Sequence, residues 1–380
     1  MPYRIIIAVI AAFFGAGAFW MFLPLLSVAL RSEGVGDVWV GIISGLPWVG
    51  LLAMSGSIPA IIRRLGLQRM VLSGMAAAVF VFLGFAATRN MQLWSLLCLV
   101  MGAAAALRWA GLDTWMNGSF PAHLRGRLTG LYELILGASM AVGPGVLAIS
   151  GSTGRAPFLA GAIVTAAAAL MLCLAGREAA HATLPGTQPA RRRDILLHEP
   201  AAFIGIFLVG LTEACNLSLL PLFGLSRGLS VHLSALLVVA VQAGVALGAI
   251  LIGSLADHLD REKLRNATAC AMVLLPLGLI LGLQEELWPW LVIWGVAQGG
   301  LFTLGIVFLA SRHSGLGLAS AMSLSMVVYT LGGIVGPPAL GLCMSLLGPS
   351  GFALGLAVIA FAGAFAVLRY RAASTAAATH

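Results

Sequence analysis

The stretch that decides the fold runs from Leu99 to Leu147, LVMGAAAALRWAGLDTWMNGSFPAHLRGRLTGLYELILGASMAVGPGVL. It consists of two long apolar runs on either side of a short basic turn, Pro121 to Arg127. An apolar run of about 20 residues is long enough to cross the roughly 30 Å hydrocarbon core of a bilayer as a helix. We therefore expect a pair of membrane-spanning helices joined by the turn.

Three ionisable side chains, Arg108, Asp113 and Glu133, interrupt these apolar runs. An ionised group near the bilayer centre costs roughly 2.5–3.5 kcal/mol or more, so such residues usually face a bundle interior or a wet cavity. Asp113 and Glu133 lie at similar depth, because they are equally far from the turn, and Arg108 lies deeper. Arg108 and Asp113 are on different helix faces, because five residues turn a helix by about 140°. We expect Arg108 to pair with Glu133 or with a carboxylate on another helix.

The composition indicates that the whole chain is an all-α membrane protein. Hydrophobic residues make up 60% and charged residues 9% of the chain, against about 25% charged residues in soluble domains. Its mean hydropathy is +1.03. The net charge of +8 does not indicate nucleic-acid binding, because the basic residues are scattered in short loops. The five cysteines are widely spaced and form no CxxC or Cys/His cluster, so we expect no metal site, disulfide framework or cofactor.

Apolar segments recur along the chain, and twelve can be drawn. Their ranges are 5–30, 39–62, 70–88, 92–119, 128–150, 157–175, 201–225, 230–255, 267–283, 288–311, 319–347 and 352–368. Twelve spans place sixteen Lys and Arg residues in the loops and tails of one side, four on the other side, and Arg108 within a span. The positive-inside rule assigns the side with sixteen to the cytoplasm. We thus expect a multi-pass protein of the inner (plasma) membrane with both termini in the cytoplasm.

The longest polar stretch divides the chain into two halves. Residues 176–200 are rich in Gly, Pro and Arg, which is typical of a linker. We expect a six-helix bundle over residues 1–175, a cytoplasmic linker over 176–200, a second six-helix bundle over 201–371 and a disordered tail over 372–380.

The two halves share sequence features at an offset of 193 to 197 residues. Pro24 near the end of the first segment recurs as Pro221, and Gly143-Pro144 recurs as Gly336-Pro337. The basic stretch that begins at Pro59 has its counterpart in the stretch that begins at Gly253. Repeated halves with a site near the membrane midplane are typical of secondary transporters.

These motifs resemble those of the major facilitator superfamily over nearly the whole chain. The most specific match is GSLADHLDREK, which contains Gly253, Asp257 and Arg261 and is similar to the family's G-x-x-x-D-x-x-G-R-[RK] loop. The stretch from Gly137 to Gly145 resembles the Gly-Pro motif of family exporters, and residues 113–132 are similar to a poorly characterised bacterial branch of exporters. The resemblance implies two pseudo-symmetric six-helix bundles that work by alternating access. It implies conformational roles for Gly137, Gly143, Pro144, Gly336, Pro337, Gly253, Asp257 and Arg261.

Polar side chains within the spans are the candidate functional residues. Carboxylates in a low-dielectric cavity can take up and release protons, so Glu133, Glu213 and Asp113 are candidates for proton coupling. The alternative for Arg108 and Asp113 is a structural role as paired charges. The candidates for lining a substrate cavity are Arg108, Trp109, Trp20, Asn117, Asn216, Gln242, Gln298 and Tyr329.

Two transport functions fit this pattern. The leading hypothesis is a proton-coupled exporter of a small amphipathic organic compound. The alternative is proton-coupled or facilitated uptake of a polar or anionic solute, such as a sugar, organic anion or vitamin, with Arg108 binding an anionic group. An enzyme is disfavoured because the sequence has no clustered catalytic residues. The expected partners are a small-molecule substrate, protons and membrane lipid, with no nucleic acid, and the expected state is a monomer.

Overall fold

The computed structural model describes residues 2–119, 135, 137–140, 154–174, 195–197, 199–256, 258–281, 287–313 and 315–377. The elements within these ranges are all α-helices. Ten of the described helices are long and apolar enough to cross a membrane. The predicted all-α membrane fold is therefore confirmed.

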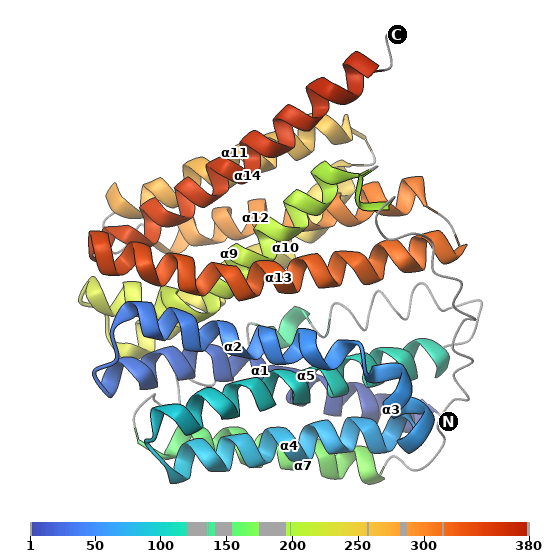
Figure 1. Ribbon diagram of the computed structural model, residues 1–380, viewed down its shortest axis with the longest axis vertical. Helices are drawn as coiled ribbons and strands as arrows, with labels where there is room; N and C mark the ends of the chain where they lie inside the picture. The colour runs from blue at the N-terminus through green and yellow to red at the C-terminus, as the bar shows by residue number, and fades with distance from the viewer. Residues whose placement is uncertain are drawn as a thin grey trace. The chain divides into compact units, whose positions relative to one another are not determined.

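The chain divides into two compact units (Figure 1). Unit 1 comprises Met1–Val35, Ile42–Leu184 and Leu229–Val239, and unit 2 comprises Gly36–Gly41, Pro185–Gly228 and Ala240–His380. Unit 1 contains α1 (Pro2–Ser32), most of α2 (Asp37–Ser55), α3 (Ile58–Leu65), α4 (Leu67–Ala87), α5 (Met91–Ser119) and α7 (Ala156–Leu174). Unit 2 contains α9 (Pro200–Ser226), most of α10 (Val231–Leu255), α11 (Arg261–Leu281), α12 (Leu287–Arg312), α13 (Gly315–Leu347) and α14 (Ser350–Ala377).

The second predicted segment, 39–62, is two helices rather than one. α2 ends at Ser55, and a short helix, α3, begins at Ile58 with a proline in its first turn. Proline has no backbone N–H and its ring clashes with the carbonyl four residues earlier, so Pro59 begins a helix more readily than it continues one. The span is therefore shorter than predicted, and α3 carries Arg63 and Arg64 in its last turn.

The last helix continues beyond its membrane span. The apolar span covers Ser350–Val367, which agrees with the predicted segment 352–368. α14 continues as a helix to Ala377, within the tail for which we expected disorder. The extension contains four alanines, at positions 372, 373, 376 and 377. Alanine has the highest helix propensity of all residues, so the helical pattern can continue after the apolar run has ended.

Unit 1 is held together by apolar contacts among α1, α4, α5 and α7. α4 packs against both α5 and α7, and α1 packs against α7. Its core includes Met70, Val71 and Met75 of α4 and Leu112 and Trp115 of α5. Small residues of one helix face large residues of the next, as where Gly161 of α7 meets the ring of Phe82 of α4, which gives the close packing of a protein interior.

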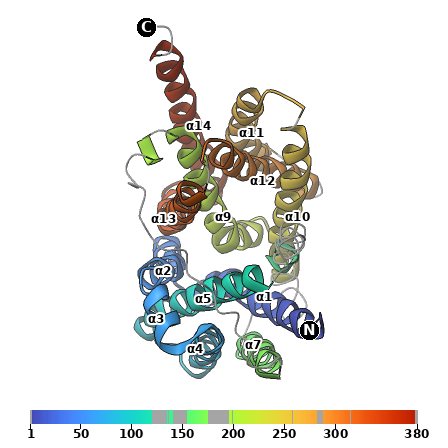
Figure 2. The ribbon, with the colours of Figure 1, turned by 90° about the vertical axis from the view of Figure 1, so that its right-hand side faces the viewer.

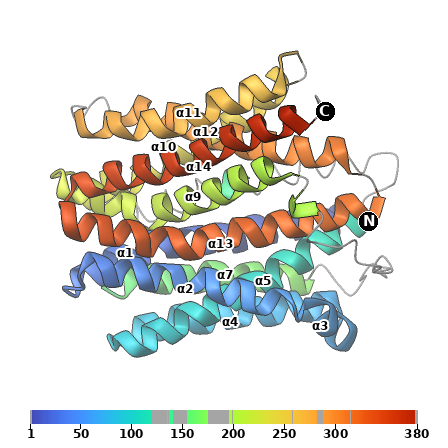
Figure 3. The same cartoon turned by 45° about the horizontal axis from the view of Figure 1, so that its top comes forward.

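Unit 2 is organised around α9. α9 packs against α13, α14 and α12, and nearly all of its length is buried. Figure 2 shows α9 among α10, α12, α13 and α14, and Figure 3 shows it running alongside α13 and α14. A helix surrounded by protein need not be apolar on every face, so α9 is where polar side chains are best tolerated within a span.

Both units use the same close helix crossing. A Cβ atom on Gly102 of α5 would overlap the carbonyl oxygen of Pro47 of α2. The corresponding crossing of unit 2 places Gly299 of α12 against the carbonyl oxygen of Val245 of α10 in the same way. Gly102 and Gly299 are 197 residues apart, which agrees with the offset of the sequence repeat. Small residues let the backbones of membrane helices approach closely.

The first long helix of each unit also ends in the same way. Gly34 follows α1 with φ +78°, and Gly228 follows α9 with φ +80°. Only glycine adopts this left-handed conformation without steric cost, which makes it the usual residue just after a helix. The repeat thus extends from the helix crossings to the helix ends.

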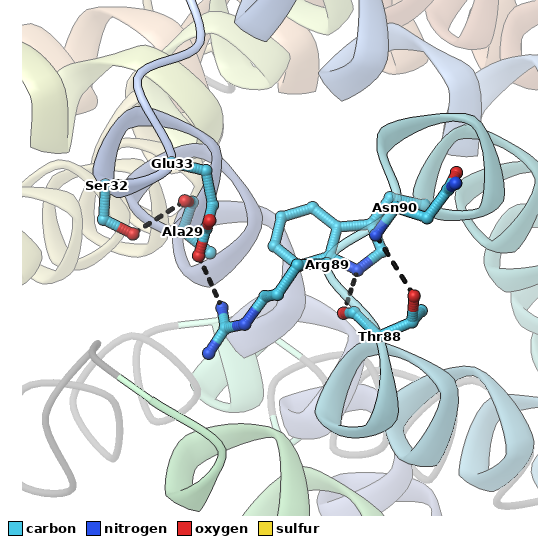
Figure 4. Close-up of polar contacts among 7 residues, drawn as sticks. Ala29, Ser32, Glu33, Thr88, Arg89 and Asn90 are labelled. Atoms are coloured by element: carbon cyan, nitrogen blue, oxygen red, sulfur yellow. Dashed lines mark hydrogen bonds and ion pairs between the residues drawn. The ribbon is translucent and has the colours of Figure 1, made fainter.

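An arginine then ties that end to a neighbouring helix. Figure 4 shows Arg89, which follows α4, paired with Glu33 at the end of α1 at 3.0 Å. In unit 2 the arginine follows the first long helix itself and not its neighbour. Arg227, which follows α9, donates from its guanidinium to the carbonyl oxygen of Leu279 of α11 at 2.8 Å. Each guanidinium also lies near an aromatic ring, that of Trp94 or of Phe223.

Candidate functional site

Unit 2 contains a buried cluster of polar side chains, which we call the amide cluster: Glu213, Asn216, Gln242, Gln298 and Tyr329. Glu213 and Asn216 are three residues apart on α9, so they lie on one helix face. Glu213 is 4% exposed. The other members come from three further helices: Gln242 from α10, Gln298 from α12 and Tyr329 from α13. All five are buried, although buried polar side chains are rare in membrane spans and usually mark functional sites.

A direct hydrogen bond connects α9 to α12 within the amide cluster. The side-chain amide of Asn216 donates to Oε1 of Gln298 at 3.0 Å. The Glu213 carboxylate faces Tyr329, Gln242 and Gln298. The groups that face Glu213 are therefore neutral amides and a phenol.

Several polar atoms of the amide cluster make no hydrogen bond within the part of the chain that the structure describes. They are Oε1 of Glu213, Oδ1 of Asn216, Oε1 and Nε2 of Gln242, and Nε2 of Gln298. Three of these atoms are acceptors and two are donors. A buried polar group without a partner costs about 1–3 kcal/mol. These atoms therefore have hydrogen-bonding capacity that the described side chains around them do not use.

A close helix contact brings α13 against α9 at this level. Gly210 lies three residues before Glu213, and a Cβ atom on it would overlap the backbone carbonyl of Tyr329. About two turns further along α13, a Cβ atom on Gly336 would lie 2.5 Å from the carbonyl oxygen of Leu211. The Tyr329 ring also makes an edge contact with Phe302 of α12, with ring centroids 5.8 Å apart. The small residues of α9 and α13 thus let the two helices approach closely and determine the position of Tyr329.

Unit 1 holds a buried charge of the opposite sign. Arg108 of α5 is 6% exposed, and its side chain crosses Gly15 of α1. A Cβ atom on Gly15 would lie 3.2 Å from Cδ of Arg108 and 3.2 Å from Cε of Met75. Arg108 also lines a small cavity with room for about one water molecule, in which Thr165 is the other polar side chain of the wall.

Two further predicted residues, Trp20 of α1 and Trp109 of α5, contact each other. The rings of Trp20 and Trp109 meet edge to face, with centroids 6.1 Å apart. Trp20 is buried, whereas Trp109 and Asp113 are half-buried. The indole pair joins α1 to α5 close to Arg108, so the aromatic and charged candidates of unit 1 lie near one another.

Some predicted residues fall outside the described part of the chain: Glu133, Gly143, Pro144 and Asp257, together with the side chain of Asn117. Gly137 is described, and a Cβ atom added to it would meet no other described residue within 4 Å. Gly253 has only an ordinary contact, with Thr303. Arg261 donates from Nε to the carbonyl oxygen of Ala256 at 3.0 Å and so closes the turn after α10. Pro337 lies inside α13, next to the close contact at Gly336.

Sequence reasoning missed two features of these sites. Gly15 was not identified as the residue that makes room for Arg108, although a glycine inside an apolar span often marks a close approach. The ion pair between Arg312 at the end of α12 and Glu199 before α9, at 2.7 Å, was also missed. The sequence feature that could have indicated this ion pair is Glu199, a carboxylate directly before Pro200, where α9 begins.

Two matches to the sequence model of the Major Facilitator Superfamily cover residues 5–312 and 202–379, which together span nearly the whole chain. The chain belongs to the major facilitator superfamily. The predicted resemblance is thereby confirmed. As a superfamily member, the protein is a multi-pass membrane protein and a secondary transporter of a small-molecule substrate.

Two curated superfamily relatives match most of the chain. An uncharacterised MFS-type transporter of Bacillus subtilis (strain 168), YfkF, is 24% identical over 84% of this chain and 83% of its own length. A 2-nitroimidazole transporter of Escherichia coli (strain K12) is 25% identical over 84% of this chain and 82% of its own length.

Solved structures share the superfamily fold at lower identity. The nucleoside transporter NupG superposes with a TM-score of 0.80 at 13% identity and covers 97% of this chain and 98% of its own. The D-xylose-proton symporter superposes with a TM-score of 0.73 at 13% identity and covers 96% of this chain and 95% of its own. At this level of identity the likeness concerns the fold alone.

Proposed function

We propose that this transporter exports a small organic solute in exchange for protons, with Glu213 as the group that takes up and releases the proton. The observation that carries the proposal is the set of groups around this buried carboxylate. Gln242, Gln298 and Tyr329 face it from α10, α12 and α13, and no Arg, Lys or His faces it within the ranges that the structure describes. A buried charge without a counter-charge is costly, so a proton is the natural partner.

Proton binding then changes the hydrogen bonds that the amide cluster can make. The ionised carboxylate only accepts hydrogen bonds, whereas the protonated group also donates one. Loading and release of a proton at Glu213 therefore alter how the cluster holds a solute. This supports coupling by alternating access, in which each conformation favours one protonation state.

The identity of the solute is tested first with 2-nitroimidazole. A curated relative at 25% identity carries this compound in its name. The compound is small and flat, which suits a buried site formed by side chains of four helices. We propose a neutral organic compound of this size as the substrate.

The alternative is uptake of a polar or anionic solute, and Arg108 is the observation that favours it. Arg108 is a buried cation beside a small cavity of unit 1. In that case an anionic solute would move in the same direction as the proton, and removal of the Arg108 charge would abolish binding.

The test is transport in vesicles that contain the purified full-length protein. We expect an imposed proton gradient to drive 2-nitroimidazole in the direction opposite to proton flow, and Glu213→Gln to abolish this response while gradient-independent exchange continues. Thr212→Val is the matched control, because the Thr212 hydroxyl on the same helix already donates to its own helix backbone. Transport that ignores the gradient in the unmodified protein would overturn proton coupling, and flux with the proton would favour uptake.

We also propose an orientation and an oligomeric state. The loops with sixteen basic residues lie in the cytoplasm, and both termini lie there too. The protein acts in the inner (plasma) membrane as a monomer. Accessibility of single cysteines in the loops to an impermeant reagent, in intact cells, checks the orientation.

A further inference from the structure

The amide cluster offers both kinds of hydrogen-bonding atom to a ligand. Oε1 of Glu213, Oδ1 of Asn216 and Oε1 of Gln242 are acceptors, and Nε2 of Gln242 and Nε2 of Gln298 are donors. An amide group always carries one donor end and one acceptor end. Both kinds are therefore present whichever way each amide is turned.

This mixed set discriminates between classes of ligand. An anion would bring a second negative charge towards Glu213 and could use only the two donors. A cation could pair with Glu213 but would leave the amide donors of Gln242 and Gln298 without partners. A site that is built to hydrogen-bond a ligand rejects analogues that leave its buried polar groups unpaired. A neutral molecule that both donates and accepts satisfies the most atoms.

The apolar wall of the cluster adds a preference for aromatic ligands. The Tyr329 ring stands edge to face with Phe302 at 5.8 Å, and Phe302 is only half-buried. Aromatic rings add about 0.5–1.5 kcal/mol beyond area burial when they pack edge to face or offset. A flat ring with a polar edge can use both kinds of group, the amides through its edge and the aromatic side chains through its face.

The geometry points to a binding site in the amide cluster for a neutral aromatic or heteroaromatic molecule that carries a carboxamide-like edge, with one donor beside one acceptor. Gln242 is its main positioning residue, because neither of its polar atoms is hydrogen-bonded to another described residue. The inference rests on the proposed function, since it takes the surroundings of Glu213 as the substrate site. It names the class of substrate.

The experiment uses four compounds of one shape that differ in charge and in hydrogen bonding: benzamide, N,N-dimethylbenzamide, benzoate and benzylammonium. Binding to the purified full-length protein is measured by calorimetry at a fixed pH without a gradient. We expect benzamide to bind most tightly. Loss of the donor in the dimethyl compound should weaken binding about tenfold, because one hydrogen bond is worth about 1 kcal/mol. Benzoate and benzylammonium should bind more weakly still.

A variant separates a binding role of Gln242 from a structural one. Gln242→Leu removes two polar atoms that make no hydrogen bond with the protein, so we expect an unchanged or higher melting temperature. The same variant should weaken benzamide binding about tenfold. Thr212→Val should leave both the melting temperature and the affinity nearly unchanged. A lower melting temperature of Gln242→Leu with unchanged affinity would show that the amide is structural and would overturn the inference, as would a preference for either charged compound.

Failure of this inference and failure of the proposed function give different results. Selective binding of benzamide together with transport that ignores the proton gradient would overturn proton coupling and leave the ligand class standing. Transport that responds to the gradient through Glu213 together with a preference for benzoate would overturn the ligand class and leave coupling standing.

Discussion

The two units keep the same scaffold but bury opposite charges in it. In unit 1 the buried charge is Arg108 of α5, which crosses Gly15 of α1. In unit 2 it is Glu213 of α9, which faces Gln298 of α12. By the offset of 197 residues that relates Pro24 to Pro221, the position equivalent to Glu213 is Ala16, next to Gly15. In each unit the buried charge thus lies between the first long helix, α1 or α9, and the helix with the close glycine contact, α5 or α12.

The difference between these two charges is chemical. A guanidinium stays protonated at any physiological pH, so Arg108 is a fixed charge. A carboxyl group can gain or lose a proton, and the neutral amides around Glu213 tolerate either form. The two halves thus share a helix crossing but differ in these buried side chains: Arg108 of unit 1 is a fixed charge, and Glu213 of unit 2 is a titratable group.

The largest expected effect is on the pH dependence of transport. Glu213→Gln should make transport independent of the proton gradient, which removes an effect of about 5–150-fold if coupling is worth 1–3 kcal/mol. Arg108→Lys should lower the rate but keep the pH dependence, because the fixed charge remains. Flux into vesicles at a series of pH values measures both. A pH response that is lost in Arg108→Lys and kept in Glu213→Gln would reverse the comparison.

The next effect concerns the shared scaffold. Gly102→Ala and Gly299→Ala each place a Cβ atom against a backbone carbonyl of the facing helix, and overpacking of this kind costs about 1–3 kcal/mol. Both should lower the melting temperature of the detergent-solubilised protein by a similar amount. Gly56→Ala is the control, because a Cβ atom there meets nothing within 4 Å. Destabilisation by only one of the pair would show that the two crossings are not equivalent.

A smaller effect is expected where α1 makes room for Arg108. In Gly15→Ala the new methyl group would contact the flexible ends of Arg108 and Met75. A gain of about 0.5–1 kcal/mol from helix propensity offsets this crowding, so we expect the free energy of unfolding to change by less than about 1 kcal/mol. Gly15→Leu should destabilise the protein clearly more. Equal melting temperatures for the two variants would contradict the close contact with Arg108.

The smallest effect is expected at the helix ends. Glu33 and Arg89 are well exposed, and exposed ion pairs contribute about 0–1 kcal/mol. Glu33→Gln should therefore lower the melting temperature slightly at low salt and not at high salt. An equal effect of Glu33→Gln at low and at high salt would show that this ion pair contributes nothing measurable to stability.

Most of the fold could be predicted from the apolar runs, because in a membrane a span must be helical and about 20 residues long. The errors lie where other forces decide. Segment 39–62 is divided because of Pro59. Mean hydropathy over the segment does not reveal this break, because it does not depend on the backbone geometry of proline. The extension of α14 to Ala377 depends on helix propensity, which acts without apolar residues.

The site was predictable in its residues but not in its contacts. Glu213, Asn216, Gln242, Gln298 and Tyr329 stand out in the sequence because polar groups in spans are rare. That four helices bring them together in unit 2 depends on crossings such as that of Gly210 with Tyr329, and sequence periodicity does not say which helices cross. The contact of Arg108 with Gly15 was hidden for the same reason.

The burial of α9 has a consequence for how the protein is made. Once folded, α9 is almost wholly surrounded by protein, yet during synthesis it enters the membrane before α10, α12 and α13 exist to cover it. At that moment Glu213 raises the free energy of insertion by about 2.5–3.5 kcal/mol, while each Leu, Ile or Phe lowers it by only about 0.3–0.6 kcal/mol. The helix that is best sheltered in the finished transporter is thus the one with the most to gain from a chaperone, or from late retention at the insertion machinery, until its neighbours arrive.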